Sequence, residues 1–166
     1  MLLRRADFNL SDFRIILWDW GPFGIGSAGN EDIETAISGF DKLMASKSLR
    51  NLKEFRFAVS SGSNDVDLYL RRVHTVVEAI VEHQSLLEKL VLAVHRSDSS
   101  FSLLPRLVNL KALSWCCHEG NGMEFSTLAV KQSIHQAFQL SPAKPVIEVS
   151  RHDWGEFPRG FTPIVD

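Results

Sequence analysis

The stretch LPRLVNLKALSW, residues 104–115, contains the spacing that decides the fold of this chain. Leu104, Leu107, Leu110 and Leu113 follow one another at intervals of three residues, and Trp115 comes two residues after Leu113. An interval of two returns a side chain to the same face of a β-strand. The unit Leu110-x-x-Leu113-x-Trp115 therefore predicts a turn and a short strand whose three apolar side chains point toward one side.

The same spacing of apolar residues recurs three more times. The matching sets are Leu52, Phe55 and Phe57; Leu87, Leu90 and Leu92; and, with substitutions, Phe13, Ile16 and Trp18. The intervening residues include Glu54 and Arg56, and such charges are costly to bury without partners. The pattern therefore predicts a sheet that buries one face and leaves the other accessible.

Helical patterns lie between the apolar strand segments. Strands are expected at residues 13–18, 53–59, 89–94 and 111–116, with a weaker fifth at 146–149. Asn30 is expected to cap a helix that reaches Met44, a second helix follows the turn sequence SSGSND, and a last one covers about 126–138. The connection at 97–109 contains Pro105 and allows only one or two helical turns. Charged helix residues are expected on a solvated outer side: Arg71, Arg72, Glu78, Glu82 and Lys131.

The alternation of strand and helix, together with the repeated spacing, resembles the leucine-rich repeat, whose signature begins L-x-x-L-x-L. The first apolar positions, at residues 13, 52, 87 and 110, are 39, 35 and 23 residues apart. Two of these intervals exceed the family's usual length of about 20–29 residues. Long, irregular repeats with tryptophan in the strands are most similar to those of fungal F-box proteins and related substrate receptors.

The resemblance covers about residues 10–150. It implies an α/β, leucine-rich-repeat-like solenoid: a short parallel sheet on one face, helices on the other, and an irregular tail over 151–166. The length of 166 residues, with 45% hydrophobic and 23% charged residues, predicts a single domain over 1–166. The resemblance further implies a non-catalytic protein-binding module, and in particular the substrate-recognition part of an F-box-type ubiquitin ligase adaptor.

Function in such a solenoid is expected on the accessible sheet face, where outward residues of neighbouring strands form rows. The alternation predicts these rows as Ile15, Glu54, Lys89 and Ala112; Leu17, Arg56, Val91 and Ser114; and Asp19, Ala58, Ala93 and Cys116. The residues predicted to bind a protein are Leu17, Asp19, Glu54, Arg56, Lys89, Val91, Ser114 and Cys116. A mixture of apolar and charged side chains suits a protein partner better than a nucleic acid.

The alternative is a small Rossmann-like nucleotide-binding enzyme that uses the loop GIGSAG, with Gly24, Gly26 and Gly29. In that fold the helix begins inside the glycine motif, so that its N-terminus points at the pyrophosphate. Here the best helix cap, Asn30, follows the last glycine. The second predicted strand ends FAVSS, without the acidic residue that would bind the ribose.

Other residues that can carry chemistry predict neither a cofactor nor a metal. Cys116 and Cys117 are adjacent, so on a strand they point to opposite faces and cannot both reach one zinc ion. Neighbouring cysteines also indicate reduced thiols and a reducing compartment. His95 and His118 follow consecutive strands, but no nucleophile motif accompanies them.

Net charge and hydropathy exclude two classes of partner. The formal net charge is -2, with no run of Lys or Arg, which argues against nucleic acid. No segment approaches the roughly 20 apolar residues of a membrane span. We therefore expect an intracellular protein, cytoplasmic or nuclear, with a protein partner, no membrane, and possible self-association through the edge of the first strand.

Overall fold

The computed structural model describes residues 12–18, 30–60, 66–94, 98–118 and 126–152. Strands and helices alternate along these residues, and the η elements are single turns of 3-10 helix. The order is β1 (Asp12–Trp18), α1 (Asn30–Met44), η1 (Lys47–Leu49), β2 (Glu54–Ser60), α2 (Val66–His83), β3 (Lys89–Ala93), α3 (Asp98–Phe101), η2 (Leu104–Arg106), β4 (Ala112–His118), α4 (Thr127–Ala137) and β5 (Val146–His152). Every strand expected from the sequence is present. The irregular tail predicted over 151–166 does not begin at residue 151, because β5 continues through Arg151 and His152.

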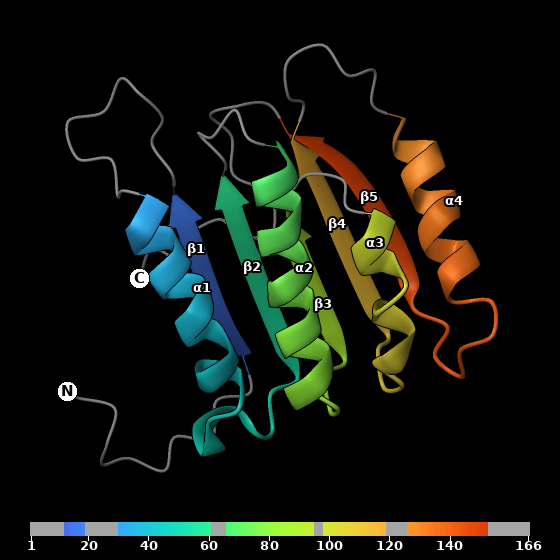
Figure 1. Cartoon of the computed structure of the whole chain (residues 1–166). Helices are drawn as coiled ribbons and strands as arrows, with labels where there is room; N and C mark the ends of the chain where they lie inside the picture. The colour runs from blue at the N-terminus through green and yellow to red at the C-terminus, as the bar shows by residue number, and fades with distance from the viewer. Residues whose placement is uncertain (1–11, 19–29, 61–65, 95–97, 119–125, 153–166) are drawn as a thin grey trace, which may run out of the picture.

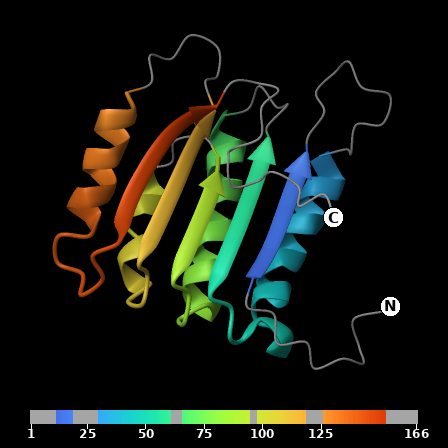
Figure 2. The ribbon, with the colours of Figure 1, turned by 180° about the vertical axis from the view of Figure 1, so that it is seen from behind.

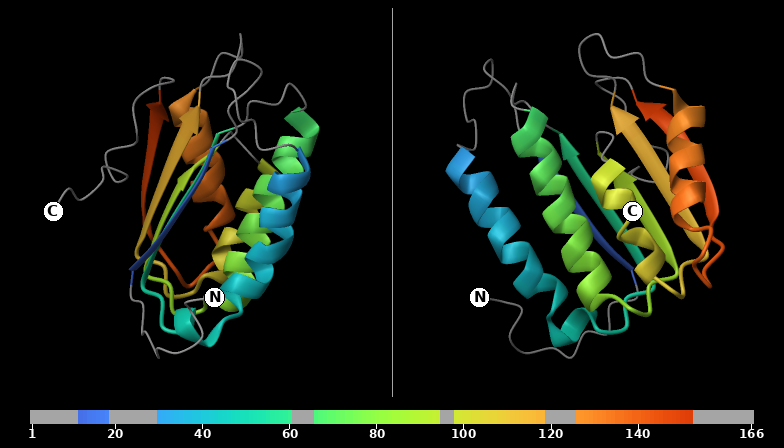
Figure 3. Two further views of the ribbon diagram at one scale, coloured as in Figure 1. Left: turned by 90° about the vertical axis from the view of Figure 1, so that its left-hand side faces the viewer. Right: turned by 45° about the vertical axis from the view of Figure 1, so that its right-hand side comes forward.

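The strands form one five-stranded parallel sheet in chain order, β1-β2-β3-β4-β5. Helices α1–α4 lie on the same side of this sheet (Figure 1). Seen from behind, the strands have no described helix in front of them (Figure 2), and the edge-on view shows a sheet layer and a helix layer (Figure 3). Connections between neighbouring parallel strands all have the same handedness. When every strand follows its predecessor in the same direction across the sheet, each connecting helix therefore lies on the same side of the sheet, and the fold has two layers. We call the side opposite the helices the outer face.

The core lies between the sheet and the helices and is built from the repeated apolar spacing. The parallel registers align Phe55, Leu90, Leu113 and Ile147 in one ladder and Phe57, Leu92, Trp115 and Val149 in the next. All but Val149 are at most 3% exposed, and Val149 packs partly buried against the same core. The helices contribute the opposite wall through Phe40, Met44, Val73, Val77, Ile80, Phe101, Val130 and Ile134.

The same turn precedes β2, β3 and β4. The backbone N–H groups of Leu52, Leu87 and Leu110 donate to the carbonyls three residues earlier, of Leu49, Gln84 and Leu107 respectively. All six side chains are at most 2% exposed. The interval of three residues between Leu107 and Leu110 therefore recurs before β2 and β3, where Leu49 and Gln84 occupy the position of Leu107.

The register of β1 differs from the predicted rows by three residues. Ile15 pairs with Phe57 and Leu17 with Val59, whereas Arg14 and Ile16 pair with Arg56 and Ala58. Because paired residues of parallel strands share a face, the prediction that Ile15 and Leu17 occupy the outer rows is wrong. Asp12 and Arg14 pair with Glu54 and Arg56 in their place, and Ile16 pairs with Ala58.

The expected solvated side of the helices has one exception. Arg71, Glu78, Glu82 and Lys131 are exposed, but the side chain of Arg72 is only 4% exposed. Helix α2 contacts α1 on one flank and α3 on the other (Figure 1), so its buried surface is wider than a single apolar stripe. Arg72 lies next to Val73 and Val76 on this widened surface.

Candidate protein-binding face

The outer face is made of residues that alternate with the buried ladders. The register forms three rows from β2 to β5: Glu54, Lys89, Ala112 and Val146; Arg56, Val91, Ser114 and Glu148; and Ala58, Ala93, Cys116 and Ser150. For β2, β3 and β4 these are the rows expected from the sequence. The structure therefore brings six of the predicted binding residues onto one surface: Glu54, Arg56, Lys89, Val91, Ser114 and Cys116. Asp19 lies outside the described residues.

Charged side chains at the start of the outer face are held in an ion-pair cluster. Oε1 of Glu54 accepts a hydrogen bond of 2.7 Å from Nε of Arg56 and lies 3.0 Å from Nζ of Lys89. Partial burial favours the neutral carboxyl, but hydrogen bonds from Lys89 and Arg56 outweigh it and lower the pKa of Glu54. The carboxylate is charged at neutral pH and keeps the two cations in fixed positions, with 44% of the Lys89 side chain exposed.

Three small residues further along the strands form a separate buried cluster on the outer face. Val91, Ala93 and Cys116 are 4%, 1% and 5% exposed. Oγ of Ser150 donates to Sγ of Cys116 at 3.2 Å. Burial raises the pKa of the Cys116 thiol, which the Ser150 hydrogen bond opposes and the nearby Glu148 carboxylate reinforces. Cys116 is therefore a weakly reactive thiol, and Val91 and Cys116 are not exposed as a binding residue would be.

Sequence reasoning missed the contribution of β5 to this face. Glu148 and Ser150 continue the second and third rows, and both are exposed. Oγ of Ser114 lies 3.4 Å from Oε2 of Glu148. The sequence could have predicted this contribution, because Ile147 and Val149 alternate with Glu148 and Ser150. The two apolar residues face the core, and the two polar residues therefore lie on the opposite side of the sheet.

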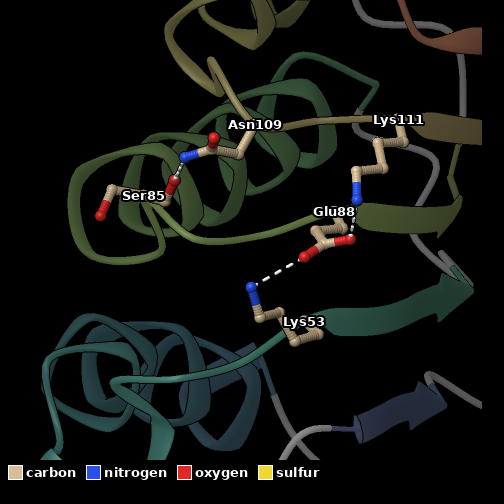
Figure 4. Close-up of polar contacts among 5 residues, drawn as sticks. All are labelled: Lys53, Ser85, Glu88, Asn109 and Lys111. Atoms are coloured by element: carbon tan, nitrogen blue, oxygen red, sulfur yellow. Dashed lines mark hydrogen bonds and ion pairs between the residues drawn. The ribbon is translucent and has the colours of Figure 1, made fainter.

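A second polar feature, the edge ladder of Lys53, Glu88 and Lys111, lies where the strands begin (Figure 4). Nζ of Lys53 is 2.7 Å from Oε1 of Glu88, and Nζ of Lys111 is 2.5 Å from Oε2. Backbone hydrogen bonds join the same neighbouring segments. The Lys89 N–H donates to the Lys53 carbonyl, and the Lys111 N–H donates to the Glu88 carbonyl. Each member of the edge ladder directly follows a buried turn leucine. The repeated spacing could therefore have predicted that these three residues lie side by side.

Acidification is expected to remove the contribution of Glu88 to stability. Hydrogen bonds from Lys111 and Lys53 lower the pKa of Glu88 from 4.5 to about 2 in the folded chain. A depressed folded pKa gives stability that is present above the unfolded pKa, here 4.5, and is lost as the pH falls toward about 2. The urea midpoints of the wild type and Glu88→Gln should therefore differ most at neutral pH and converge near pH 2.

The control for this measurement is Glu78→Gln, which removes an exposed carboxylate from α2. It should leave the pH dependence of the urea midpoint close to that of the wild type. A difference between wild type and Glu88→Gln that persists undiminished at about pH 2 would contradict an ionic role for Glu88.

Of the residues considered above for catalysis or metal binding, the structure describes the side chains of Cys116 and Cys117. Cys117 belongs to the core on the helix side and Cys116 to the outer face, as expected for neighbours on a strand. Gly24, Gly26, Gly29 and His95 lie outside the described residues, and so does the side chain of His118. Among the described residues, no group of three or more His, Cys, Asp or Glu is placed to hold a metal ion.

A hollow of about 670 Å³ lies beside α4 and the segment that leads into β5. Its polar lining consists of amides, His135 and Lys144. Nζ of Lys144 already donates to the carbonyls of Phe138 and Gln139, at 3.0 and 2.9 Å, and so closes the C-terminal end of α4. The lining contains no carboxylate, and its lysine is held by the two carbonyls at the end of α4.

Comparisons of the chain with protein-family models, with curated proteins and with solved structures found no match. In the described part of the chain, none of the helices combines the length and apolar character needed to cross a membrane.

Proposed function

We propose that this chain is a non-catalytic protein-binding module of the leucine-rich-repeat-like solenoid type, and that its outer face binds a protein partner. The observation that carries the proposal is the sheet order β1-β2-β3-β4-β5, with every described helix on one side (Figure 3). This layout leaves a row-forming sheet surface on the opposite side, which is the surface that solenoids use for recognition.

The chemistry of the outer face favours a protein as partner. Its described charges balance, since Arg56 and Lys89 accompany Glu54 and Glu148. Nucleic acid would require a cationic surface. The cations are also preorganised by Glu54, which reduces the entropy lost when a partner's polar groups bind them. A partner surface with a carboxylate for Lys89 and an apolar group for Val146, which is 68% exposed in the same row, fits this arrangement.

The proposal is tested by reversing single charges on the two sides of the sheet. Lys89→Glu places a negative charge on the outer face, and Lys131→Glu does the same on exposed α4. A partner captured by the wild-type chain and then purified should bind Lys89→Glu about ten-fold or more weakly and Lys131→Glu with unchanged affinity. Equal binding by both variants, with unchanged melting temperatures, would refute the outer face as the binding surface.

The rival enzyme function depends on Gly24, Gly26 and Gly29. Doubly wound nucleotide-binding sheets bind ligand where the strand order reverses and the helices change sides. The described strands follow in chain order, and α1 begins at Asn30, after the last glycine. Melting temperatures measured with NAD, ATP and S-adenosylmethionine separate the two functions, because a ligand at 100 times its dissociation constant stabilises by about 2.7 kcal/mol. A rise with any of them would favour the enzyme.

The resemblance to F-box-type substrate receptors extends the proposal to a biological role. In that role the captured partner is a ubiquitination substrate, so its cellular level should fall when the wild-type chain is overproduced and stay unchanged with Lys89→Glu. If the level of the partner is the same with both chains, the role in degradation is rejected, while the proposal that the chain binds this partner still stands.

A further inference from the structure

Positive charge gathers at the edge of the sheet where the strands begin. Four connections lead from an α-helix to the next strand there: residues 45–53, 84–88, 102–111 and 138–145 (Figure 1). They contain six cations and one anion, namely Lys47, Arg50, Lys53, Arg106, Lys111 and Lys144 against Glu88. Since the whole chain has a formal net charge of -2, this edge differs in sign from the protein as a whole.

Two of the six cations already have structural partners. Nζ of Lys144 donates to two carbonyls at the end of α4. Nη2 of Arg106 lies 3.0 Å from Oε2 of Glu82 at the end of α2. These two cations stabilise helix ends, so we set them aside.

The other four cations, Lys47, Arg50, Lys53 and Lys111, are named the basic rim. Lys53 and Lys111 share the single carboxylate of Glu88. Within the described part of the chain, no carboxylate lies within ion-pair distance of Lys47 or Arg50. The basic rim therefore has four positive charges and one negative charge, and it can bind further carboxylates.

The turn before β2 places three members of the rim on one ridge. Lys47 and Arg50 are three residues apart in the 3-10 turn η1, where the Arg50 N–H donates to the Lys47 carbonyl. Side chains at this interval in a 3-10 turn lie above one another. Lys53 follows after the same interval, and the buried Leu49 and Leu52 occupy the positions just before Arg50 and Lys53. Lys47 and Arg50 are exposed.

The turns before β3 and β4 extend this ridge across the sheet. Glu88 joins Lys53 to Lys111, and Nδ2 of Asn109 donates to the Ser85 carbonyl at 2.8 Å (Figure 4). These links hold the turns in place, while 73% of the Lys111 side chain stays exposed. Cations that are already positioned lose less conformational entropy when a ligand binds them.

Exposed apolar side chains accompany these cations. Leu86 is 40% and Val108 51% exposed, and both lie in the connections at this edge. Val108 directly follows the buried Leu107 as Arg50 follows Leu49, so the repeat gives Val108 and Arg50 equivalent positions. A nucleic-acid backbone is recognised through its phosphates alone, whereas a protein segment supplies both carboxylates and apolar groups.

We propose that the basic rim binds an acidic segment of a protein, whose carboxylates contact the four cations and whose apolar side chains contact Leu86 and Val108. This inference goes beyond the proposed function, because it concerns the edge of the sheet where the strands begin. It depends on the charges and exposures of the rim, and the outer face is a separate binding surface.

The test measures the fluorescence anisotropy of a labelled acidic peptide, EGLEEGLEEGLE, mixed with the full chain. Its neutral counterpart, QGLQQGLQQGLQ, should bind about ten-fold or more weakly, and added salt should weaken the acidic peptide. Arg50→Glu should weaken the acidic peptide about five-fold or more, because it reverses a charge on the ridge. Lys131→Glu makes the same change of sign on exposed α4 and should leave the affinity unchanged.

Equal binding of the two peptides, or equal losses in Arg50→Glu and Lys131→Glu, would overturn the proposal. If Arg50→Glu lowers the melting temperature, Arg50→Gln replaces it, and an unchanged affinity in that variant refutes the rim. An oligothymidylate that binds as tightly as the acidic peptide would reject a protein segment as the ligand. Failure of the peptide to bind rejects the rim alone, because the outer face is tested separately with Lys89→Glu.

Discussion

Replacing Trp115 with alanine is expected to lower the free energy of unfolding by about 3–5 kcal/mol. The indole is 0% exposed and lies in the ladder with Phe57, Leu92 and Val149. Its ring is edge-on to that of Phe101, with the centroids 4.8 Å apart, and this contact joins β4 to α3. Truncation would leave a cavity that the rigid sheet cannot close. Urea unfolding followed by circular dichroism measures the loss, which corresponds to about 2–4 °C of melting temperature per kcal/mol.

Ser114→Ala is the matched control, because Ser114 is the adjacent residue on the outer face and is half-buried. It is expected to change stability by no more than about 0.5 kcal/mol. Trp115→Phe should fall between the two, since it keeps an aromatic ring against Phe101 and removes an indole N–H that has no hydrogen-bond partner in the described structure. Equal losses for Ser114→Ala and Trp115→Ala would contradict the assignment of the two faces.

The parts of the fold that were predictable are those fixed by spacing within one repeat. A turn leucine and two alternate strand residues face the core whatever the neighbouring repeat contains, so Leu87, Leu90 and Leu92 were identified from the chain alone. The segment of β1, FRIILW, is apolar at every position except Arg14, so its alternation is weak and the spacing of the other repeats gave the wrong set. The pairing with β2 places Ile15 and Leu17 in the rows of Phe57 and Val59.

Features that depend on contacts between repeats were not predictable in the same way. The burial of Arg72 follows from the helices on both flanks of α2, which widen its buried surface beyond the apolar stripe. The edge ladder forms only if Lys53, Glu88 and Lys111 occupy equivalent positions in neighbouring turns. The parallel register of the strands aligns these positions. The candidate site shows the same limit: alternation placed Val91 and Cys116 on the outer face, but it does not predict that they are buried there.

Gln84 is the polar exception among the buried turn residues, and its replacement is the second large effect that we expect. It occupies the position of Leu49 and Leu107 in the repeat and is 1% exposed. Its Nε2 donates to the carbonyl of Met44 at 2.7 Å, at the end of α1, where helix carbonyls lack intrahelical donors. The amide thus joins the end of α1 to the turn before β3.

Gln84→Leu, which introduces the residue found at the other two positions, is expected to lower the free energy of unfolding by about 1–3 kcal/mol, because the Met44 carbonyl loses its donor in a buried place. Gln84→Ala should cost more, since it adds a cavity. Gln136→Leu, an exposed position on α4, is the control and should stay within about 0.5 kcal/mol of the wild type in urea unfolding. If Gln84→Leu is as stable as the wild type or more so, the position is an ordinary apolar site of the repeat, and the hydrogen bond to Met44 adds nothing to the stability of the fold.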